Sequence, residues 1–334
     1  MMNDLKQREQ INLLSIKNLH AWYETYAGYS KVINGVDFAV NYGEKVGLIG
    51  ESGCGKTTLM KNILRVAPTH IPEGEIYLKD IDVRKANNNT ILQIRRKYVS
   101  MISQEPMSAL NPVFTVGQQL EDIIRYSDQS QKRSKKEIRK LSCEAIARVL
   151  ISDPERILDS YPHQLSGGMR QRVCIASALV TPRDLLIADE PCTALDVTIQ
   201  DQIHRLLRDL THDAQRAFIM ITHSLGVARE LVDRIYVMYA GNIVESAPVN
   251  AILDNPLHPY TQGLLQCIPR LYGGGLSEGI YGYVPDYVRT NYGCRFCTRC
   301  RYAISRCEKE KPPIYKVDDD HGVACFLYEK EAKN

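Results

Sequence analysis

A glycine-rich segment near residue 50 has the residue types and spacing of a phosphate-binding loop. Residues 50–57 read GESGCGKT, which matches G-x-x-x-x-G-K-[ST], and they follow the apolar run 46–49. Glycines let backbone N–H groups face phosphate oxygens, and a helix beginning at Lys56 adds partial positive charge. Lys56 is then expected to contact the β and γ phosphates of a nucleoside triphosphate, and Thr57 to coordinate Mg²⁺. Cys54 occupies a free position of the pattern, where a small filler is favoured over a redox group.

Two acidic residues stand at the end of another apolar run. Asp189 and Glu190 follow 185–188, and the carboxyl end of a buried strand is where α/β folds bind ligands. We expect Asp189 to anchor Mg²⁺, directly or through its second sphere. We expect Glu190 to orient and deprotonate an attacking water.

Two further polar side chains end apolar runs in the same way. His223 comes after 218–221 and Thr222, so its imidazole is expected to contact the γ-phosphate. Gln104 comes after 98–102, where an amide would bind Mg²⁺ or the attacking water and sense the γ-phosphate.

The segment 165–169, LSGGM, provides a second anion site. Ser166, Gly167 and Gly168 open a segment of helical character, and a helix start with a serine and glycines binds anions. One nucleotide needs only one such cradle. The second is therefore expected to close on a nucleotide held by another subunit.

Taken in order, these segments resemble the motifs of the ABC transporter ATPases. LSGGM with RQR after it is similar to the family's signature, and the match extends over about residues 12–260. The other motifs are the Walker A loop at 50–57, the Q-loop at Gln104, Walker B at Asp189 with Glu190, the D-loop at 194–196 and the H-loop at His223.

The resemblance implies a head-to-tail dimer in which ATP and Mg²⁺ lie between the Walker A loop of one chain and the signature of the other. It implies ATP contacts at Ser52, Gly53, Cys54, Gly55, Lys56, Thr57, Thr58, Ser166, Gly167 and Gly168. Tyr23 is expected to stack on adenine, with Trp22 as the alternative. Catalysis is assigned to Glu190, His223, Lys56 and Gln104, and Mg²⁺ to Thr57, Gln104 and Asp189.

These side chains need a sheet to position them. Short, wholly apolar runs suit strands covered on both faces, and strands alternating with helices indicate a doubly wound α/β core. With the resemblance, we predict an α/β P-loop NTPase (RecA-like) core with an antiparallel β subdomain and a helical insertion at about 112–170. Paired strands are expected over 32–49, broken by a turn at 41–43. The nucleotide-binding domain is placed at 1–262, and a small Cys-rich, metal-bound extension at 263–334.

Composition narrows the classes of partner. The 334 residues carry a net charge of +3, too small to indicate a nucleic-acid partner or an anionic membrane surface. The first residues contain no apolar run of signal-peptide length, and no run of about 18 apolar residues occurs anywhere. The chain is therefore not expected to cross a bilayer by itself, and the resemblance implies a peripheral subunit at the cytoplasmic face of the cell membrane.

Three strings resemble the oligopeptide/dipeptide importer ATPases in particular: QEPMSALNP at 104–112, YPHQ at 161–164 and NPLHPYT at 255–261. That group also includes importers of nickel and other small solutes, which are the alternative cargo. The implied partners are a second ABC ATPase subunit (identical or a sister chain), two transmembrane permease subunits and an extracytoplasmic peptide-binding protein, with no nucleic acid. The rival functions are a soluble ABC ATPase acting on nucleic acid and an iron–sulfur redox protein with an ATP switch.

Half of the ten cysteines lie between 294 and 325. In a chain without a secretion signal, clustered cysteines indicate a metal site before disulfides. The resemblance implies ligands at Cys294, Cys300, Cys307 and Cys325, whereas spacing alone also allows a triplet that includes Cys297. Four thiolates suit a [4Fe–4S] cluster, which we favour, or Zn²⁺.

We expect this metal to be a clip that stabilises the fold rather than an electron carrier, because so short a tail cannot build its own core. Arginines that surround the thiols are expected to offset their negative charge. They are Arg295, Arg299, Arg301 and Arg306.

Overall fold

The middle of the chain, Ala86–Met220, folds as one unit, and the segments on either side of it, Met1–Lys85 and Ile221–Asn334, fold together as another. We call the flanking segments the first unit and the middle segment the second unit. The computed structural model describes residues 12–127, 132–192, 195–212, 216–267, 279–288 and 293–331. The predicted domain boundary at 262/263 stays a prediction.

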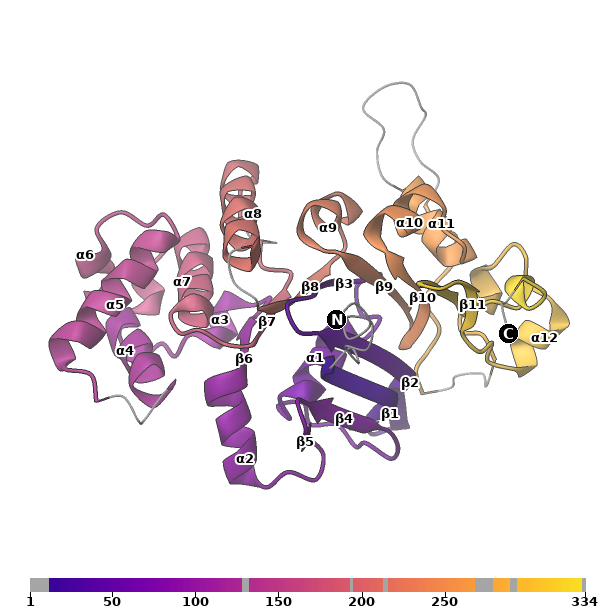
Figure 1. The fold of residues 1–334 in the computed structure, drawn as a ribbon, viewed down its shortest axis with the longest axis horizontal. Helices are drawn as coiled ribbons and strands as arrows, with labels where there is room; N and C mark the ends of the chain where they lie inside the picture. Colours follow the sequence, from indigo (N-terminus) through magenta and orange to yellow (C-terminus); the bar gives the residue numbers. More distant parts are fainter. Residues whose placement is uncertain are drawn as a thin grey trace, which may run out of the picture. The chain divides into compact units, whose positions relative to one another are not determined.

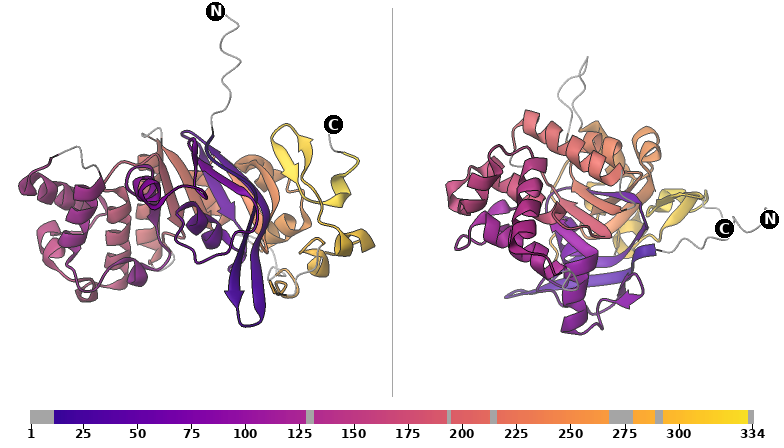
Figure 2. Two further views of the ribbon diagram at one scale, coloured as in Figure 1. Left: turned by 90° about the horizontal axis from the view of Figure 1, so that it is seen from below. Right: turned by 60° about the vertical axis from the view of Figure 1, so that its left-hand side comes forward.

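An antiparallel sheet in the first unit confirms the expected β subdomain. Its strands lie in the order β2-β1-β4-β5, with β1 and β2 forming a long hairpin (Figure 2). Their bounds are β1 Asn12–Thr25, β2 Gly28–Asn41, β4 Glu75–Leu78 and β5 Ile81–Asp82.

The first unit also contains strands that run in the order β11-β12-β10-β9-β3. β3 is parallel to β9, and the pairs β9–β10, β10–β12 and β11–β12 are antiparallel. Their bounds are β3 Lys45–Ile49, β9 Arg234–Tyr239, β10 Asn242–Pro248, β11 Tyr315–Asp318 and β12 His321–Val323. The helices of this unit are α1 Lys56–Ile63, α9 Leu225–Leu231, α10 Val249–Asp254, α11 Pro259–Gln266, η3 Cys297–Arg299, α12 Ser305–Lys309 and η4 Phe326–Tyr328.

The expected pairing of strands over 32–49 was wrong. A turn does separate β2 from β3, but β2 pairs with β1 and β3 pairs with β9, so the two strands belong to different sheets. Apolar residues on both sides of a turn are compatible with a hairpin, and only the partners of each strand decide between the two arrangements.

The second unit contains the parallel pair β6 and β7 and most of the helices (Figure 1). Its elements are α2 Asn88–Gln93, η1 Ile94–Tyr98, β6 Val99–Ile102, α3 Pro106–Ala109, α4 Val116–Ser127, α5 Lys135–Arg148, α6 Pro154–Asp159, η2 Pro162–Gln164, α7 Gly167–Leu179, β7 Leu185–Asp189 and α8 Val197–His212. β8, Ala217–Thr222, carries the chain back into the first unit. All residues of β7 and β8 are buried, as the apolar runs 185–188 and 218–221 predicted.

The C-terminal segment is built onto the first unit rather than around a core of its own. β12 adds to the edge of β10, beside which the yellow β11–β12 hairpin lies in Figure 1. The Phe296 ring packs edge-on against Tyr239, with centroids 5.0 Å apart, and lies 5.5 Å from Tyr260. The tail folds because its few apolar side chains are buried against apolar residues of the rest of the first unit.

In the part of the chain that the structure describes, no helix combines the length and the apolar character that crossing a bilayer requires.

Candidate functional site

The predicted phosphate-binding loop lies between β3 and α1, as its sequence required. Lys56 is 5% exposed, and its Nζ donates to the carbonyl oxygens of Gly50 at 2.7 Å and Glu51 at 2.8 Å. Both partners are carbonyl oxygens without a formal charge, so a phosphate bound in the loop would supply the counter-charge of this side chain. Gly55 has a φ of +106°, which a side chain would strain.

The back of this loop is anchored by hydrogen bonds. The Cys54 carbonyl accepts from the Gly241 amide at 2.8 Å, and the Glu51 amide donates to the Tyr260 hydroxyl at 2.8 Å. Burial raises the pKa of the Cys54 thiol, which is 1% exposed. Cys54 is therefore a packed, protonated side chain, in keeping with the filler role expected for it.

β1 presents the two aromatic candidates to different surroundings. The Tyr23 hydroxyl lies 3.2 Å from the Thr58 Oγ1, directly after the loop. Trp22 packs instead near the rings of Tyr29 and His70, at centroid distances of 5.8 and 6.1 Å. The register of the β1–β2 pair shifts between Ala21 and Tyr23, and the Tyr23 hydroxyl reaches the first turn of α1.

In the second unit, β6 and β7 bring Gln104 and Glu190 together at their carboxyl ends. The Gln104 Nε2 donates to the Glu190 Oε2 at 3.2 Å, and Asp189 is 1% exposed at the last position of β7. Glu190 has a φ of +45°, an unusual conformation for a residue with a Cβ, and such strain collects at functional sites. The ends of β6 and β7 thus place the Gln104 and Glu190 side chains in contact.

Ser166 caps the N-terminus of α7. Its Oγ accepts from the Met169 amide at 3.3 Å, and Ser166 and Gly167 are exposed. A Cβ on Gly167 would meet no atom within 4 Å, so the space in front of this turn is open. A capped helix start that faces outward can receive an anion from a separate molecule.

A hydrogen bond also joins α7 to the segment that follows Glu190. The buried Gln171 Nε2 donates to the Pro191 carbonyl at 2.6 Å. His223 is exposed at the end of β8 in the first unit. Ala194 of the predicted D-loop lies outside the described residues.

The cysteines of the tail open onto one small cavity of about 50 Å³. Its other walls are largely apolar, formed by side chains such as Phe296, Ile304 and Phe326. The cavity is lined by Cys294, Cys297, Cys300, Cys307 and Cys325. Burial raises the pKa of the Cys294 thiol to about 12.

The expected metal-bound extension is not supported as a formed ligand set. Among the residues that the structure describes, no three or more His, Cys, Asp or Glu side chains are arranged to hold one ion. The fold does bring the five cysteines to one cavity. The Cys294 amide donates to the Cys307 carbonyl at 2.7 Å, and a Cβ on Gly293 would lie 2.2 Å from that oxygen, so only glycine allows this approach.

The arginines beside these cysteines have partners other than the sulfur atoms. Arg306 donates to Glu310 at 2.7 Å and to Glu329 at 3.0 Å. Arg295 donates to the carbonyls of Ala240 and Lys31, and Arg299 binds Glu51. Charge compensation of the thiols therefore stays a prediction, and the hydrogen bonds of these three side chains go to other groups.

Sequence patterns missed the residues that hold the loop from behind: Arg299, Tyr287 and Tyr260. Tyr260 lies in the NPLHPYT string, which indicated a subfamily without indicating a contact. The other two had no local signal, because each lies more than 200 residues from the loop.

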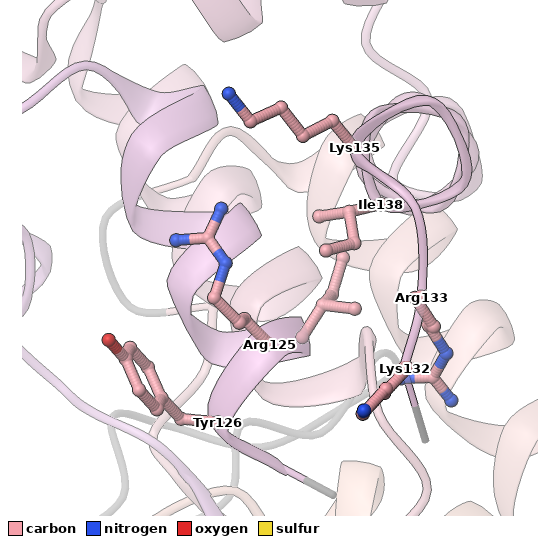
Figure 3. A pocket seen from close by; sticks show the side chains of 7 residues that line it. Arg125, Tyr126, Lys132, Arg133, Lys135 and Ile138 are labelled. Carbon is pink, nitrogen blue, oxygen red and sulfur yellow. The ribbon is translucent and has the colours of Figure 1, made fainter. Parts of the chain in front are cut away.

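A hollow of about 650 Å³ in the second unit is lined by basic side chains, but their charged ends do not point toward one place (Figure 3). Arg125 already pairs with Asp122 at 2.8 Å, and Figure 3 shows the ends of Lys135 and Arg133 pointing in different directions. These residues form a solvated, charged surface, not a second site.

Two family models match different parts of this chain. The family model described as ABC transporter matches residues 33–193, and that described as oligopeptide/dipeptide transporter, C-terminal region, matches 244–307. The oligopeptide transport ATP-binding protein AppD of Bacillus subtilis is 42% identical over 96% of this chain and 98% of its own. The dipeptide transport ATP-binding protein DppD of the same organism is 40% identical over 96% of both chains.

Solved structures support the same assignment. An ATP-binding cassette, solved as a dimer in a post-hydrolysis state with ADP and Pi, superposes with a TM-score of 0.65 and 27% identity, over 71% of this chain and 98% of that one. This likeness confirms the predicted α/β P-loop fold.

Proposed function

This chain belongs to the ABC transporter family, and we propose that it is the ATP-hydrolysing subunit that powers an importer of dipeptides or oligopeptides. The observation that carries this proposal is the exposed Ser166 turn, a second anion cradle in a chain that has its own phosphate loop. Peptide cargo is supported by its relatives, which are oligopeptide and dipeptide transport proteins, and by the C-terminal match at 244–307. Nickel or another small solute is the alternative cargo.

The loop 50–57 binds the triphosphate. Its backbone N–H groups and the start of α1 surround the phosphate oxygens, and Lys56 supplies the positive charge between the β and γ groups. Tyr23 stacks on adenine, since its hydroxyl already lies beside Thr58 at the end of the loop. The remaining contacts come from Ser52, Gly53, Cys54, Gly55 and Thr57.

Mg²⁺ and the attacking water bind beside the carboxylates of Asp189 and Glu190. Thr57, Asp189 and Gln104 supply the hard oxygen ligands that Mg²⁺ prefers. Glu190 accepts a proton from water while the Gln104 amide orients its carboxylate at 3.2 Å. His223 contacts the γ-phosphate, and the lysine and loop amides stabilise the charge that develops there.

Two chains complete each site. Ser166, Gly167 and Gly168 of one subunit bind the γ-phosphate held by the loop of the other, so the nucleotide bridges both surfaces. Hydrolysis removes the bridge and shifts the population toward open dimers. The partner is a second ABC ATPase, a sister chain or an identical one. Two permease subunits and an extracytoplasmic peptide-binding protein complete the importer, and this chain works at the cytoplasmic face of the membrane.

The cysteine cavity fits a metal clip. Thiols that share an apolar cavity of about 50 Å³ are a soft donor set, suited to a [4Fe–4S] cluster or Zn²⁺. Cys294, Cys300, Cys307 and Cys325 would hold the group, which would join segments of the tail that lie far apart in sequence. When bound, the group would cross-link these segments and so stabilise the fold.

The Glu190→Gln variant tests the catalytic assignment. An amide cannot accept the proton of the attacking water, so we expect turnover to fall by about 10²–10⁴-fold while ATP binding remains. The trapped ATP should also stabilise a dimer, detected by size-exclusion chromatography with Mg²⁺ and ATP. Glu155→Gln, on the exposed surface of α6, is the matched control. Unchanged turnover in Glu190→Gln would remove Glu190 from catalysis.

A further inference from the structure

One arginine of the cysteine-rich tail is joined to the phosphate-binding loop. The Arg299 guanidinium forms a two-point ion pair with Glu51, the second residue of the loop, at 2.8 Å (Nη1–Oε2) and 3.1 Å (Nη2–Oε1). The Arg299 side chain is 5% exposed and that of Glu51 26%, so the pair is shielded from water on one side. Bidentate geometry of this kind fixes the orientation of both groups.

The other donors of Arg299 are used as well. Its Nε donates to the Tyr281 carbonyl at 2.9 Å, its Nη2 to the Ile280 carbonyl at 2.9 Å and its Nη1 to the Tyr239 hydroxyl at 3.3 Å. A guanidinium held at all of its nitrogen atoms cannot swing away. Glu51 is therefore tied to a rigid point of the first unit.

A tyrosine of the same C-terminal region holds the next part of the loop. The Tyr287 hydroxyl donates to the Gly53 carbonyl at 2.9 Å, and the Tyr287 carbonyl accepts from the Lys31 amide at 2.9 Å. The C=O and N–H of a trans peptide point in opposite directions. The Gly53 carbonyl shares its peptide with the Cys54 N–H, which donates to the Glu51 carbonyl at 3.3 Å, so the Tyr287 contact and this turn together fix the backbone of residues 51–54.

The ion pair also neutralises a negative charge in the phosphate-binding loop. Glu51 places a carboxylate in a loop whose ligand carries several negative charges, and like charges at short range disfavour binding. Arg299 neutralises that carboxylate without approaching the nucleotide itself. Removing the guanidinium would leave an unpaired negative charge and a looser loop.

We propose that Arg299 and Tyr287 are positioning residues of the nucleotide site, through which the C-terminal region holds the phosphate-binding loop in its binding conformation. This proposal rests on the function proposed above for residues 50–57. It gives the C-terminal region a part in ATP affinity as well as in folding.

The test measures binding of the non-hydrolysable analogue AMPPNP with Mg²⁺ to the full-length chain by calorimetry, together with KM and kcat for ATP. For Arg299→Gln we expect Kd and KM to rise about 10-fold with kcat at saturating ATP nearly unchanged, since binding rather than chemistry is affected. Arg299→Lys should recover part of the affinity, because an ammonium cannot make the two-point pair. Adding Glu51→Gln to Arg299→Gln should also recover affinity, because no unpaired carboxylate then remains.

The matched control is Arg306→Gln, which removes an arginine of the same tail that pairs with Glu310 and Glu329 instead of with the loop. It should bind AMPPNP as the parent does. Equal affinity in Arg299→Gln and the parent, or equal losses in the Arg299 and Arg306 variants, would overturn the proposal.

Tyr287→Phe keeps the test decisive if Arg299→Gln does not fold. Loss of one hydroxyl should raise Kd by about 3–10-fold, the value of one hydrogen bond. Unchanged affinity in a folded Tyr287→Phe chain would then reject the proposal. If the parent chain itself failed to bind AMPPNP, the proposed function, and not this inference alone, would be wrong.

Discussion

Glu190 shows how a single residue can be prepared for its task by the backbone. Its φ of +45° costs free energy, roughly 1–2 kcal/mol for a residue with a Cβ. The buried strand β7 and the hydrogen bond from Gln104 hold it in place. The carboxylate therefore need not reorganise when a water arrives, which is what a general base requires.

The identity of the thiol ligands is also a question at the scale of residues. We expect Cys307→Ser to lose the bound metal and any visible absorption of thiolate–iron bonds, measured by elemental analysis and spectroscopy of the purified chain. Cys143→Ser is the control, because Cys143 lies on α5 and contacts Glu155 instead.

The Cys297→Ser variant separates the two possible ligand sets, since metal is retained only if Cys297 is not a ligand. A brown, iron-containing chain favours the cluster, and a colourless chain with zinc favours Zn²⁺. A parent chain with neither metal would reject the metal clip.

Local spacing was enough to place the loop between a strand and a helix and the Ser166 turn at a helix start, because each depends on elements next to it in sequence. Arg299 and Tyr287 could not be found in this way. Their partners, Glu51 and Gly53, lie 248 and 234 residues earlier in the chain, and only the pairing of distant elements brings them together. The strands β2 and β3 were assigned to one sheet for the same reason.

At the scale of elements, the NPLHPYT string explains how α11 is attached to the sheet. Glu245 of β10 is fully buried and accepts from the amides of Leu257 and His258 at 2.8 and 2.9 Å and from His321 Nε2 at 2.8 Å. His258 then caps α11, with its Nδ1 accepting from the Tyr260 amide at 3.0 Å. One buried carboxylate thus joins β10, α11 and the β11–β12 hairpin.

This attachment predicts a loss of stability in mild acid. Burial lowers the pKa of His258 from 6.5 to about 4, so the imidazole is neutral in the folded chain. Below about pH 6.5 the unfolded chain binds a proton that the folded chain does not, and stability falls as the pH drops toward 4. At pH 5 the loss is on the order of 2 kcal/mol. It should appear as a lower urea midpoint at pH 5 than at pH 7.

The His258→Asn variant keeps a capping acceptor for α11 but cannot titrate, so its midpoint should change less between these two pH values. His163→Asn, at an exposed position, is the control and should behave as the parent does. Equal pH dependence in the parent and His258→Asn would contradict this account.

At the scale of the whole molecule, every recognised motif occurs once, so a complete site needs a second subunit. A bulky residue in the signature turn should leave the chain's own loop intact and still abolish turnover. We expect Ser166→Arg to bind AMPPNP normally and to hydrolyse ATP about 10²–10³-fold more slowly, since donors to the γ-phosphate are blocked.

Mixing experiments identify the partner. Lys56→Ala and Ser166→Arg chains are each inactive, but in a pair formed by one of each, the Ser166→Arg loop faces an intact signature. Recovered turnover on mixing would mean that the chain pairs with itself, and its absence, with full activity beside a sister ATPase, would mean that it does not. Full activity of Ser166→Arg alone would refute the two-chain site.

The aromatic cluster on β1 has a practical consequence. Trp22 is the single tryptophan of the chain, one position before Tyr23, and the Lys31 ammonium lies 5.3 Å from its ring. Indole emission responds to nearby charge and packing, so the tryptophan fluorescence of this protein arises beside the adenine pocket proposed here. The unlabelled chain carries its own optical probe of nucleotide occupancy.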